Sequence, residues 1–154
     1  MINHHHVRVT VATHCRLRCA IAKAISRNFS ADMLPIRMPS RTLAIVNCCD
    51  RDKPGMHWLA MYNDENSRLE VFDSFGQSPY LYNLQEKLPR ANVLTYNTTQ
   101  IQSLNSELCG QYCLYYIYFK ARGFDISDII GIFSNDYYNN DAYVYDTVLK
   151  LYNI

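Results

Sequence analysis

The chain has 154 residues, which is the size of one ordinary domain. Hydrophobic residues make up 49% and charged residues 19%, a balance that can bury a core and therefore excludes disordered, collagen-like and low-complexity classes. No apolar run reaches the roughly 18 residues of a membrane span, and the start lacks the apolar stretch of a secretory signal. We therefore expect a soluble, intracellular protein with no membrane partner. Its six Cys are then reduced thiols rather than a disulfide scaffold.

The net charge of +1 hides an uneven distribution along the chain. Residues 1–41 carry seven basic side chains and one acidic side chain, whereas residues 42–154 carry eight basic and thirteen acidic ones. The basic segment is interpreted as a solvated helix face, an arm that touches nucleic acid or an acidic partner, or a targeting peptide, which its low Ser content disfavours. We divide the chain into a basic N-terminal segment, 1–28, and a folded domain, 29–154.

The first half of the chain predicts one helix followed by strands. Residues 13–28 have apolar side chains at helical spacing, with basic ones off that stripe, and predict an amphipathic helix. Pro35 and Pro39 interrupt regular structure, so residues 29–40 are predicted to form a loop. Short apolar runs separated by turn residues then predict strands. The predicted strands are 42–47, 56–62, 68–73 and 92–96.

The second half of the chain is mainly helical. Residues 108–122 are apolar nearly all round, as expected for a helix buried at the centre of a domain. Ser106 is its predicted N-cap, and Gly123 stands where a C-terminal glycine belongs. The other predicted helices are 80–88, 126–133 and 142–152. The order of helix, strands and helices predicts an α+β domain in which helices flank a small mixed sheet.

His57 and Asp73 form the first candidate catalytic pair. His57 begins one predicted strand, beside the only Trp of the chain, and Asp73 ends the next. If the two strands are antiparallel neighbours, the carboxylate lies close to the imidazole, where it holds the tautomer and stabilises the protonated ring. The alternatives are a structural His on a strand and an Asp that caps a turn.

Cys109 is the candidate nucleophile. It lies at the start of the predicted central helix, where unpaired N–H groups and the helix dipole favour the thiolate. Gly110 follows it and allows a backbone to come close. Gln102, seven residues upstream, can donate from its carboxamide to a developing oxyanion, together with the N–H of Cys109. These residues supply a base, an orienting acid, an oxyanion donor and a nucleophile.

The other Cys and His residues give weaker signals. His14, Cys15 and Cys19 lack a second pair of ligands at a usable spacing, so we expect no metal site. Cys48 and Cys49 are interpreted as ordinary thiols, with redox regulation as the alternative. Cys113, one helical turn after the candidate nucleophile, is predicted to pack in the core. The thirteen Tyr are interpreted as packing residues, with an aromatic partner surface as the alternative.

Four motifs resemble the adenovirus protease (adenain, peptidase family C5) family, including relatives encoded by Maverick/Polinton DNA transposons. The motifs are Leu43-Ala-Ile-Val-Asn47, Gly55-Met-His57-Trp58, Phe72-Asp-Ser-Phe-Gly76 and Gln102-Ser-Leu-Asn-Ser-Glu-Leu-Cys109-Gly110. They span residues 42–119 in the family's order of His, acid, Gln and Cys. The resemblance implies a papain-like, Ulp-type α+β fold whose buried central helix carries the nucleophile.

The resemblance also implies a cysteine endopeptidase and a role for each site residue. His57 would be the base, Asp73 the third member of the triad and Cys109 the nucleophile. Gln102 would donate to the oxyanion, while Trp58 and Gly110 would line the site. The implied substrates are polypeptides, namely capsid and core precursors cut near small residues such as Gly. The implied setting is a virus-like particle in the host nucleus, and we expect a monomer.

Three departures from the family limit what the resemblance implies. The acid Asp73 stands where mammalian adenoviral enzymes carry Glu, in an equivalent role. Residues 88–100 lack the cysteine through which adenoviral enzymes join an activating peptide, and residues 42–154 are net acidic, unlike the strongly basic DNA-activated enzymes. We therefore expect no required peptide or DNA cofactor, and only weak nucleic-acid binding through residues 1–28.

Two other functions fit the same residues. One is a SUMO- or ubiquitin-like isopeptidase of the same clan, which is disfavoured because the step from Gln102 to Cys109 is one residue longer than in SUMO proteases. The other is a catalytically idle, element-derived copy kept as a binding module. All four site residues are present, which gives no support for a loss of catalytic activity.

Overall fold

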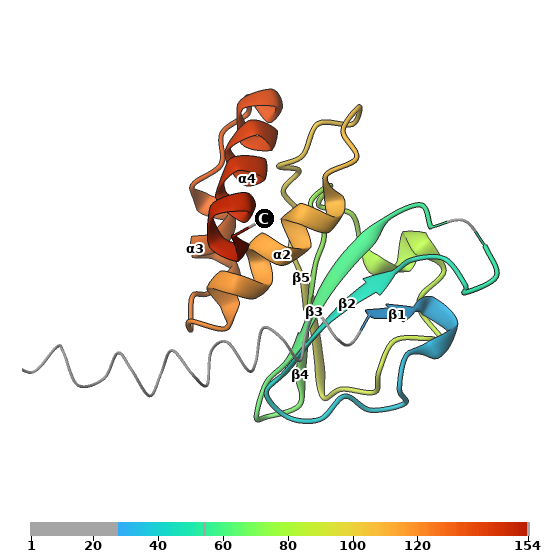
Figure 1. Cartoon of the computed structure of the whole chain (residues 1–154). Helices are drawn as coiled ribbons and strands as arrows, with labels where there is room; N and C mark the ends of the chain where they lie inside the picture. Colours follow the sequence, from blue (N-terminus) through green and yellow to red (C-terminus); the bar gives the residue numbers. More distant parts are fainter. Residues whose placement is uncertain (1–27, 54, 154) are drawn as a thin grey trace, which may run out of the picture.

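The computed structural model describes residues 28–53 and 55–153, which contain a five-stranded sheet with the strands in chain order (Figure 1). The strands are β1 (Asn28–Ser30), β2 (Thr42–Asn47), β3 (Trp58–Asn63), β4 (Arg68–Phe72) and β5 (Val93–Tyr96). The central pairs β2–β3 and β3–β4 are antiparallel, whereas the outer pairs β1–β2 and β4–β5 are parallel. The small mixed sheet expected from the sequence is confirmed.

Strand β3 shows how the sheet separates two hydrophobic cores, because successive side chains of a strand point to opposite faces. Ala60 is fully buried and, with the half-buried Trp58 and Tyr62, packs in the cluster that contains the long helices. Leu59 and Met61 are also fully buried but pack in a second cluster on the other face. The sheet is therefore covered on both faces, and the start of β3 lies between the two cores.

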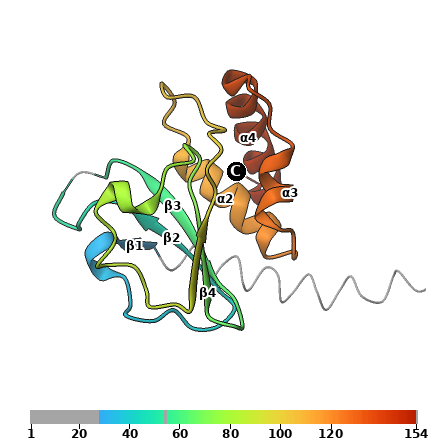
Figure 2. The same cartoon turned by 180° about the vertical axis from the view of Figure 1, so that it is seen from behind.

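Helices α2 (Cys109–Lys120), α3 (Ile126–Gly131) and α4 (Tyr137–Tyr152) gather on one face of the sheet, with α2 between the sheet and α4 (Figures 1 and 2). The buried face of α2 includes Tyr112 and Tyr116, and the ring of Tyr116 stacks on Phe72 of β4 at a centroid distance of 4.7 Å. The predicted helix buried at the centre of the domain is confirmed. None of the helices in the described ranges has the length and apolar character needed to cross a membrane.

Two N-terminal predictions need correction. Of the helix predicted at 13–28, residues 13–27 lie outside the described residues, and Asn28 opens strand β1. The loop predicted at 29–40 contains the rest of β1 and a single 3-10 turn, η1 (Ala31–Met33). An edge strand of three residues is too short to show an alternating pattern, so only its pairing with β2 reveals it.

The helical boundaries also differ from the predictions. In place of the helix at 80–88 there is one 3-10 turn, η2 (Pro79–Tyr82), which ends because Asn83 adopts a left-handed conformation with φ of 55°. The last helix begins at Tyr137 rather than 142, since Asp136 caps it by accepting the Asn139 N–H at 3.1 Å. The helix predicted at 126–133 ends at Gly131.

The central helix begins one residue later than predicted, at Cys109, with Leu108 rather than Ser106 as its N-cap. The hydroxyl of Ser106 instead accepts the N–H of Leu108 at 3.3 Å, just before the helix. The C-terminal glycine is confirmed, because Gly123 has a φ of 89°, a left-handed conformation that glycine adopts without steric cost. Cys109 thus occupies the first turn of α2, where backbone N–H groups are unpaired.

Candidate active site

The ends of two antiparallel strands bring His57 and Asp73 together. His57 directly precedes β3, Asp73 directly follows β4, and the register pairs Ala60 with Phe72. The two side chains therefore lie at the same edge of the sheet. The Nε2 atom of His57 is 2.7 Å from Oδ1 of Asp73, and both residues are buried. The proximity predicted from the sequence is confirmed.

The Asp73 carboxylate is fixed by four donors. Its Oδ1 atom accepts the N–H of Phe75 at 2.9 Å in addition to the His57 contact. Its Oδ2 atom accepts the Tyr82 hydroxyl at 2.8 Å and the N–H of Gln77 at 3.2 Å. The rings of Phe75 and Tyr82 also pack against the imidazole, with centroid distances of 4.8 and 5.3 Å. The imidazole is thus held at its ring faces as well as at Nε2.

The turn after β4 is fixed by Asn97 and Gly76. Asn97 accepts the backbone N–H of Asp73 through Oδ1 at 2.8 Å and donates from Nδ2 to the Asp73 carbonyl at 2.6 Å. Gly76 has a φ of 64°, and a Cβ atom there would lie 2.5 to 2.8 Å from the backbone of residues 98–100. The sequence analysis missed Tyr82 and Asn97, and only the glycine of the Asp-x-x-Gly turn carries a readable signal.

Cys109 on α2 faces His57, and the two groups shift each other's proton affinity. Burial alone lowers the pKa of His57, but hydrogen bonds and charge interactions with Asp73 and Cys109 raise it to about 9. Burial alone raises the pKa of the Cys109 thiol, yet His57 and the N–H groups of Trp58 and Gly110 lower it overall. These directions favour a thiolate–imidazolium pair at neutral pH.

Gln102 lies in the loop between β5 and α2 with its amide held at both ends. Its Oε1 atom accepts the Ser74 hydroxyl at 2.5 Å, and its Nε2 atom donates to the carbonyl of Ser106 at 2.9 Å. Nε2 is also 3.2 Å from the hydroxyl of Ser106. The side chain is fully buried. Nε2 therefore has two acceptors within reach, both on Ser106, and donation to a ligand would replace one of them.

Trp58 and Gly110 occupy different parts of the site. Trp58 is half-buried against the cluster that contains α2, and its backbone N–H helps to lower the pKa of the Cys109 thiol. The backbone N–H of Gly110 lowers that pKa as well. No described atom lies within 4 Å of where a Gly110 Cβ would be, so no described backbone segment makes the close approach expected from the sequence.

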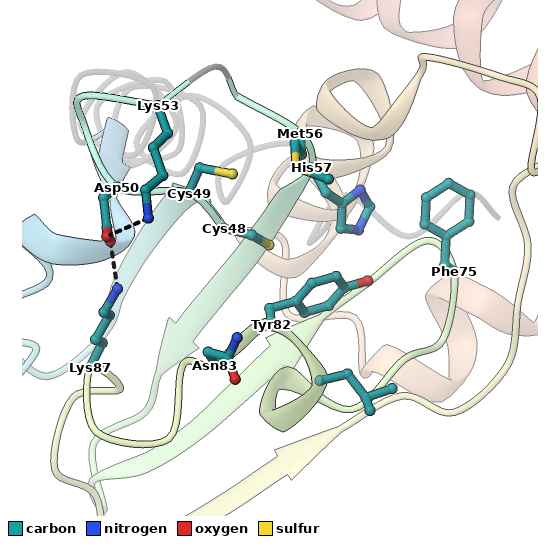
Figure 3. A pocket seen from close by; sticks show the side chains of 11 residues that line it. Cys48, Cys49, Asp50, Lys53, Met56, His57, Phe75, Tyr82, Asn83 and Lys87 are labelled. Atoms are coloured by element: carbon teal, nitrogen blue, oxygen red, sulfur yellow. Dashed lines mark hydrogen bonds and ion pairs between the residues drawn. The ribbon is translucent and has the colours of Figure 1, made fainter.

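A pocket of about 470 Å³ adjoins the site through His57 (Figure 3). The side chains of His57 and Tyr82 border it on one side. On the other side the Asp50 carboxylate contacts the Nζ atoms of Lys87, at 2.5 Å, and Lys53, at 3.5 Å. Between these two sides the wall of the pocket is formed by Cys48, Cys49 and Met56 of the β2–β3 loop. The pocket is large enough for side chains of an extended peptide.

The other thiols of the described residues differ from Cys109. Burial raises the pKa of Cys48 and that of Cys113, which is packed in the core as predicted. Neither thiol is therefore activated as a nucleophile. Cys15, Cys19 and the N-terminal His residues lie outside the described residues. Within 28–53 and 55–153, no group of three or more His, Cys, Asp or Glu side chains is arranged to hold a metal ion.

A helix-borne thiol beside an imidazole that is hydrogen bonded to a carboxylate, on a five-stranded mixed sheet, fits the papain-like α+β fold expected from the sequence. The family follows from sequence comparison. Residues 34–131 match the family model described as adenovirus endoprotease. The match covers more than half of the chain, and the chain belongs to this family.

The proteases of two bovine adenoviruses agree with this assignment. The chain is 34% identical to the protease of Bovine adenovirus 4 over 97 residues, which cover 52% of this chain and 48% of that protein. It is 29% identical to the protease of Bovine adenovirus C serotype 10 over 118 residues, which cover 62% and 60%. The chain thus spans about half the length of the curated relatives it matches. The crystal structure of the Se-Met ASFV pS273R protease matches 90% of this chain and 65% of its own, with 19% identity and a TM-score of 0.49.

Proposed function

We propose that this protein is a cysteine endopeptidase with Cys109 as nucleophile, His57 as general base and acid, and Asp73 as the residue that orients and stabilises the imidazole. The observation that supports it most is the pair of opposed changes in proton affinity. The pKa of the Cys109 thiol is lowered although the residue is half-buried, while that of His57 is raised to about 9. Burial would drive each group in the opposite direction, so specific contacts oppose it at both positions.

In the proposed acylation step the Cys109 thiolate attacks the carbonyl carbon of a peptide bond, and the carbonyl π electrons move onto oxygen. The backbone N–H of Cys109 and one N–H of the Gln102 amide, released from Ser106, stabilise this oxyanion. The oxyanion then reforms the carbonyl, the C–N bond breaks, and the His57 imidazolium gives its proton to the leaving amine. The products are a thioester on Cys109 and a neutral His57.

In the proposed deacylation step neutral His57 takes a proton from water while the water oxygen attacks the thioester carbon. The C–S bond breaks when the second tetrahedral intermediate collapses, which releases a carboxylic acid and regenerates the thiolate–imidazolium pair. Asp73 holds the ring through Nε2 in both steps, which leaves Nδ1 for the Cys109 sulfur. The carboxylate needs no proton of its own in either step.

The proposed substrates are polypeptides, namely viral or element-encoded capsid and core precursors cut near small residues. The family and the relatives from adenoviruses support this substrate class. Side chains of the substrate would enter the pocket beside His57. We also propose that cleavage needs neither a peptide nor a DNA cofactor, and that the protein acts as a monomer in virus-like particles and the host nucleus.

The test is cleavage-site profiling of the purified 154-residue chain on a proteome-derived peptide library. Cys109→Ala is the inactive control, and Cys113→Ala, one turn further along α2, is the matched control that should keep activity. Cuts near small residues that require Cys109 are expected. A folded protein with no Cys109-dependent cuts would overturn the proposal. Cleavage of SUMO or ubiquitin fusions instead of library peptides would replace it with the isopeptidase function.

A further inference from the structure

The loop that carries Gln102 is held by side chains of helix α4. The two residues that flank Gln102 are the attachment points. The carbonyl of Ile101 accepts a hydrogen bond from Nδ2 of Asn140 at 3.0 Å. The N–H of Ser103 donates to Oδ1 of Asp141 at 3.4 Å. Adjacent residues of α4 thus bind the backbone on both sides of the proposed oxyanion donor, 38 and 39 positions earlier in the chain.

Asp141 also connects the loop to the helix that carries the nucleophile. The hydroxyl of Tyr112 lies 2.9 Å from Oδ1 of Asp141 and 3.0 Å from the carbonyl of Ile101, so its single proton is shared between two acceptors. Tyr112 is fully buried on α2, one helical turn after Cys109. Helix α4 therefore sets the position of Gln102 relative to Cys109 through one connected network.

The polarity of these residues is costly in their setting. Asn140 and Asp141 are both buried, with exposed fractions of 5% and 8%. An amide or a carboxylate in a buried position destabilises a fold unless its polar atoms find partners. Asn140 meets this requirement by also donating to the carbonyl of Ser134 at 2.8 Å and accepting its N–H at 3.2 Å. Two apolar side chains at these positions would pack without the free-energy cost of burying polar groups, but they could not bind the loop.

We propose that Asn140 and Asp141 are positioning residues for the oxyanion site, which keep the Gln102 amide at its working distance from Cys109. The inference rests on the proposed endopeptidase function. Donors to an oxyanion must be held in place before the reaction, and displacements near 1 Å cost about 10²-fold in rate. The network adds a third support to Gln102, beside Ser74 and Ser106, and it is the one that comes from α4.

The test separates acyl transfer from thiol reactivity in variants of the 154-residue chain. Asn140→Ala and Asp141→Leu remove the loop contacts, while Asp141→Asn keeps an oxygen acceptor. Asn139→Ala, at an exposed position on the same helix, is the matched control. We expect kcat on a cleaved peptide to fall about 10- to 100-fold for the two disruptive variants, with KM within about twofold. Asp141→Asn should recover most of the lost kcat, and Asn139→Ala should match the unaltered protein.

Alkylation of Cys109 by iodoacetamide distinguishes loss of oxyanion positioning from a general loss of structure. Only a general loss of structure should change the alkylation rate. This displacement at carbon forms no oxyanion, so its rate and pH dependence should stay within about twofold of the unaltered protein. Normalising kcat to the fraction of Cys109 that reacts at pH 6 corrects for unfolded protein. A normalised kcat unchanged in Asn140→Ala, or alkylation that falls in parallel with kcat, would overturn the inference.

Hydrogen exchange of the unaltered protein provides a measurement that needs no variant. The N–H of Ser103 should exchange as slowly as amides in the middle of α4, because opening it requires release from Asp141. Exchange at the rate of an open loop would contradict the attachment of this loop to α4, whatever the enzyme activity. If Ser103 is protected but the unaltered protein cleaves no peptide, the proposed function has failed and not the loop attachment.

Discussion

The clearest prediction concerns the Asp73 carboxylate, which is replaced by an amide of the same shape in Asp73→Asn. All four groups that face its oxygens are donors in the structure: the His57 ring nitrogen, the Tyr82 hydroxyl and two backbone N–H groups. The new amide oxygen can still face His57, and the Tyr82 hydroxyl can turn to accept from the new NH₂. One backbone N–H then loses its acceptor, which should lower the free energy of unfolding by about 1–2 kcal/mol.

The catalytic effect should be larger than this structural one. Although burial opposes it, contact with Asp73 and Cys109 raises the pKa of His57 from 6.5 to about 9. One pKa unit corresponds to about 1.4 kcal/mol, so the imidazolium is favoured by about 3 kcal/mol. The Asp73 hydrogen bond is the largest favourable cause, and a hydrogen bond to a charged group typically contributes about 2 kcal/mol. Asp73→Asn should therefore lower kcat/KM at pH 7 about 30-fold.

The assay is the pH dependence of kcat/KM, with circular dichroism to verify folding. For a raised His57 pKa the imidazolium persists through neutral pH and is lost above about pH 9, so the unaltered protein should lose activity there. In Asp73→Asn the alkaline limb should move towards pH 7, and the alkylation profile of Cys109 should move to higher pH because its thiolate loses imidazolium. A folded Asp73→Asn protein with both profiles unchanged would refute the role assigned to the carboxylate.

Three further predictions test the nucleophile, the turn and the cofactor. Cys109→Ala should abolish peptide cleavage while changing the urea-derived free energy of unfolding by less than about 1 kcal/mol, and residual cleavage would exclude Cys109 as nucleophile. Gly76→Ala should destabilise the fold by about 2 kcal/mol or more, because the φ of Gly76 is 64° and the backbone of residues 98–100 occupies the space of a Cβ atom. The control Gly131→Ala should be nearly neutral in the same urea titration, because a Cβ atom there meets nothing within 4 Å. Duplex DNA should leave kcat/KM within about twofold at low salt, and a large increase would show that DNA is a cofactor after all.

His57, Asp73 and Cys109 could be proposed as site residues from the sequence because each lies in a short motif. His57 and Asp73 lie at the ends of adjacent runs that read as strands, and an antiparallel pairing then places them at one edge of the sheet. Cys109 opens an apolar segment long enough to be the buried central helix, which accounts for its proximity to backbone donors. Such features are local, because the period of a strand or helix and the residues that end it lie within a few positions of each other.

The hydrogen bonds that support these residues can be seen only in the tertiary structure. Asn97 lies 24 positions from Asp73, and Asn140 lies 39 positions from Ile101. A hydrogen bond between distant segments leaves no periodic trace in the sequence, so nothing marked these residues as partners of the site. The start of α4 was misplaced for a related reason. Asn140 and Asp141 are poor helix formers by propensity, and they are tolerated in the first turns of this helix because the loop satisfies their polar atoms.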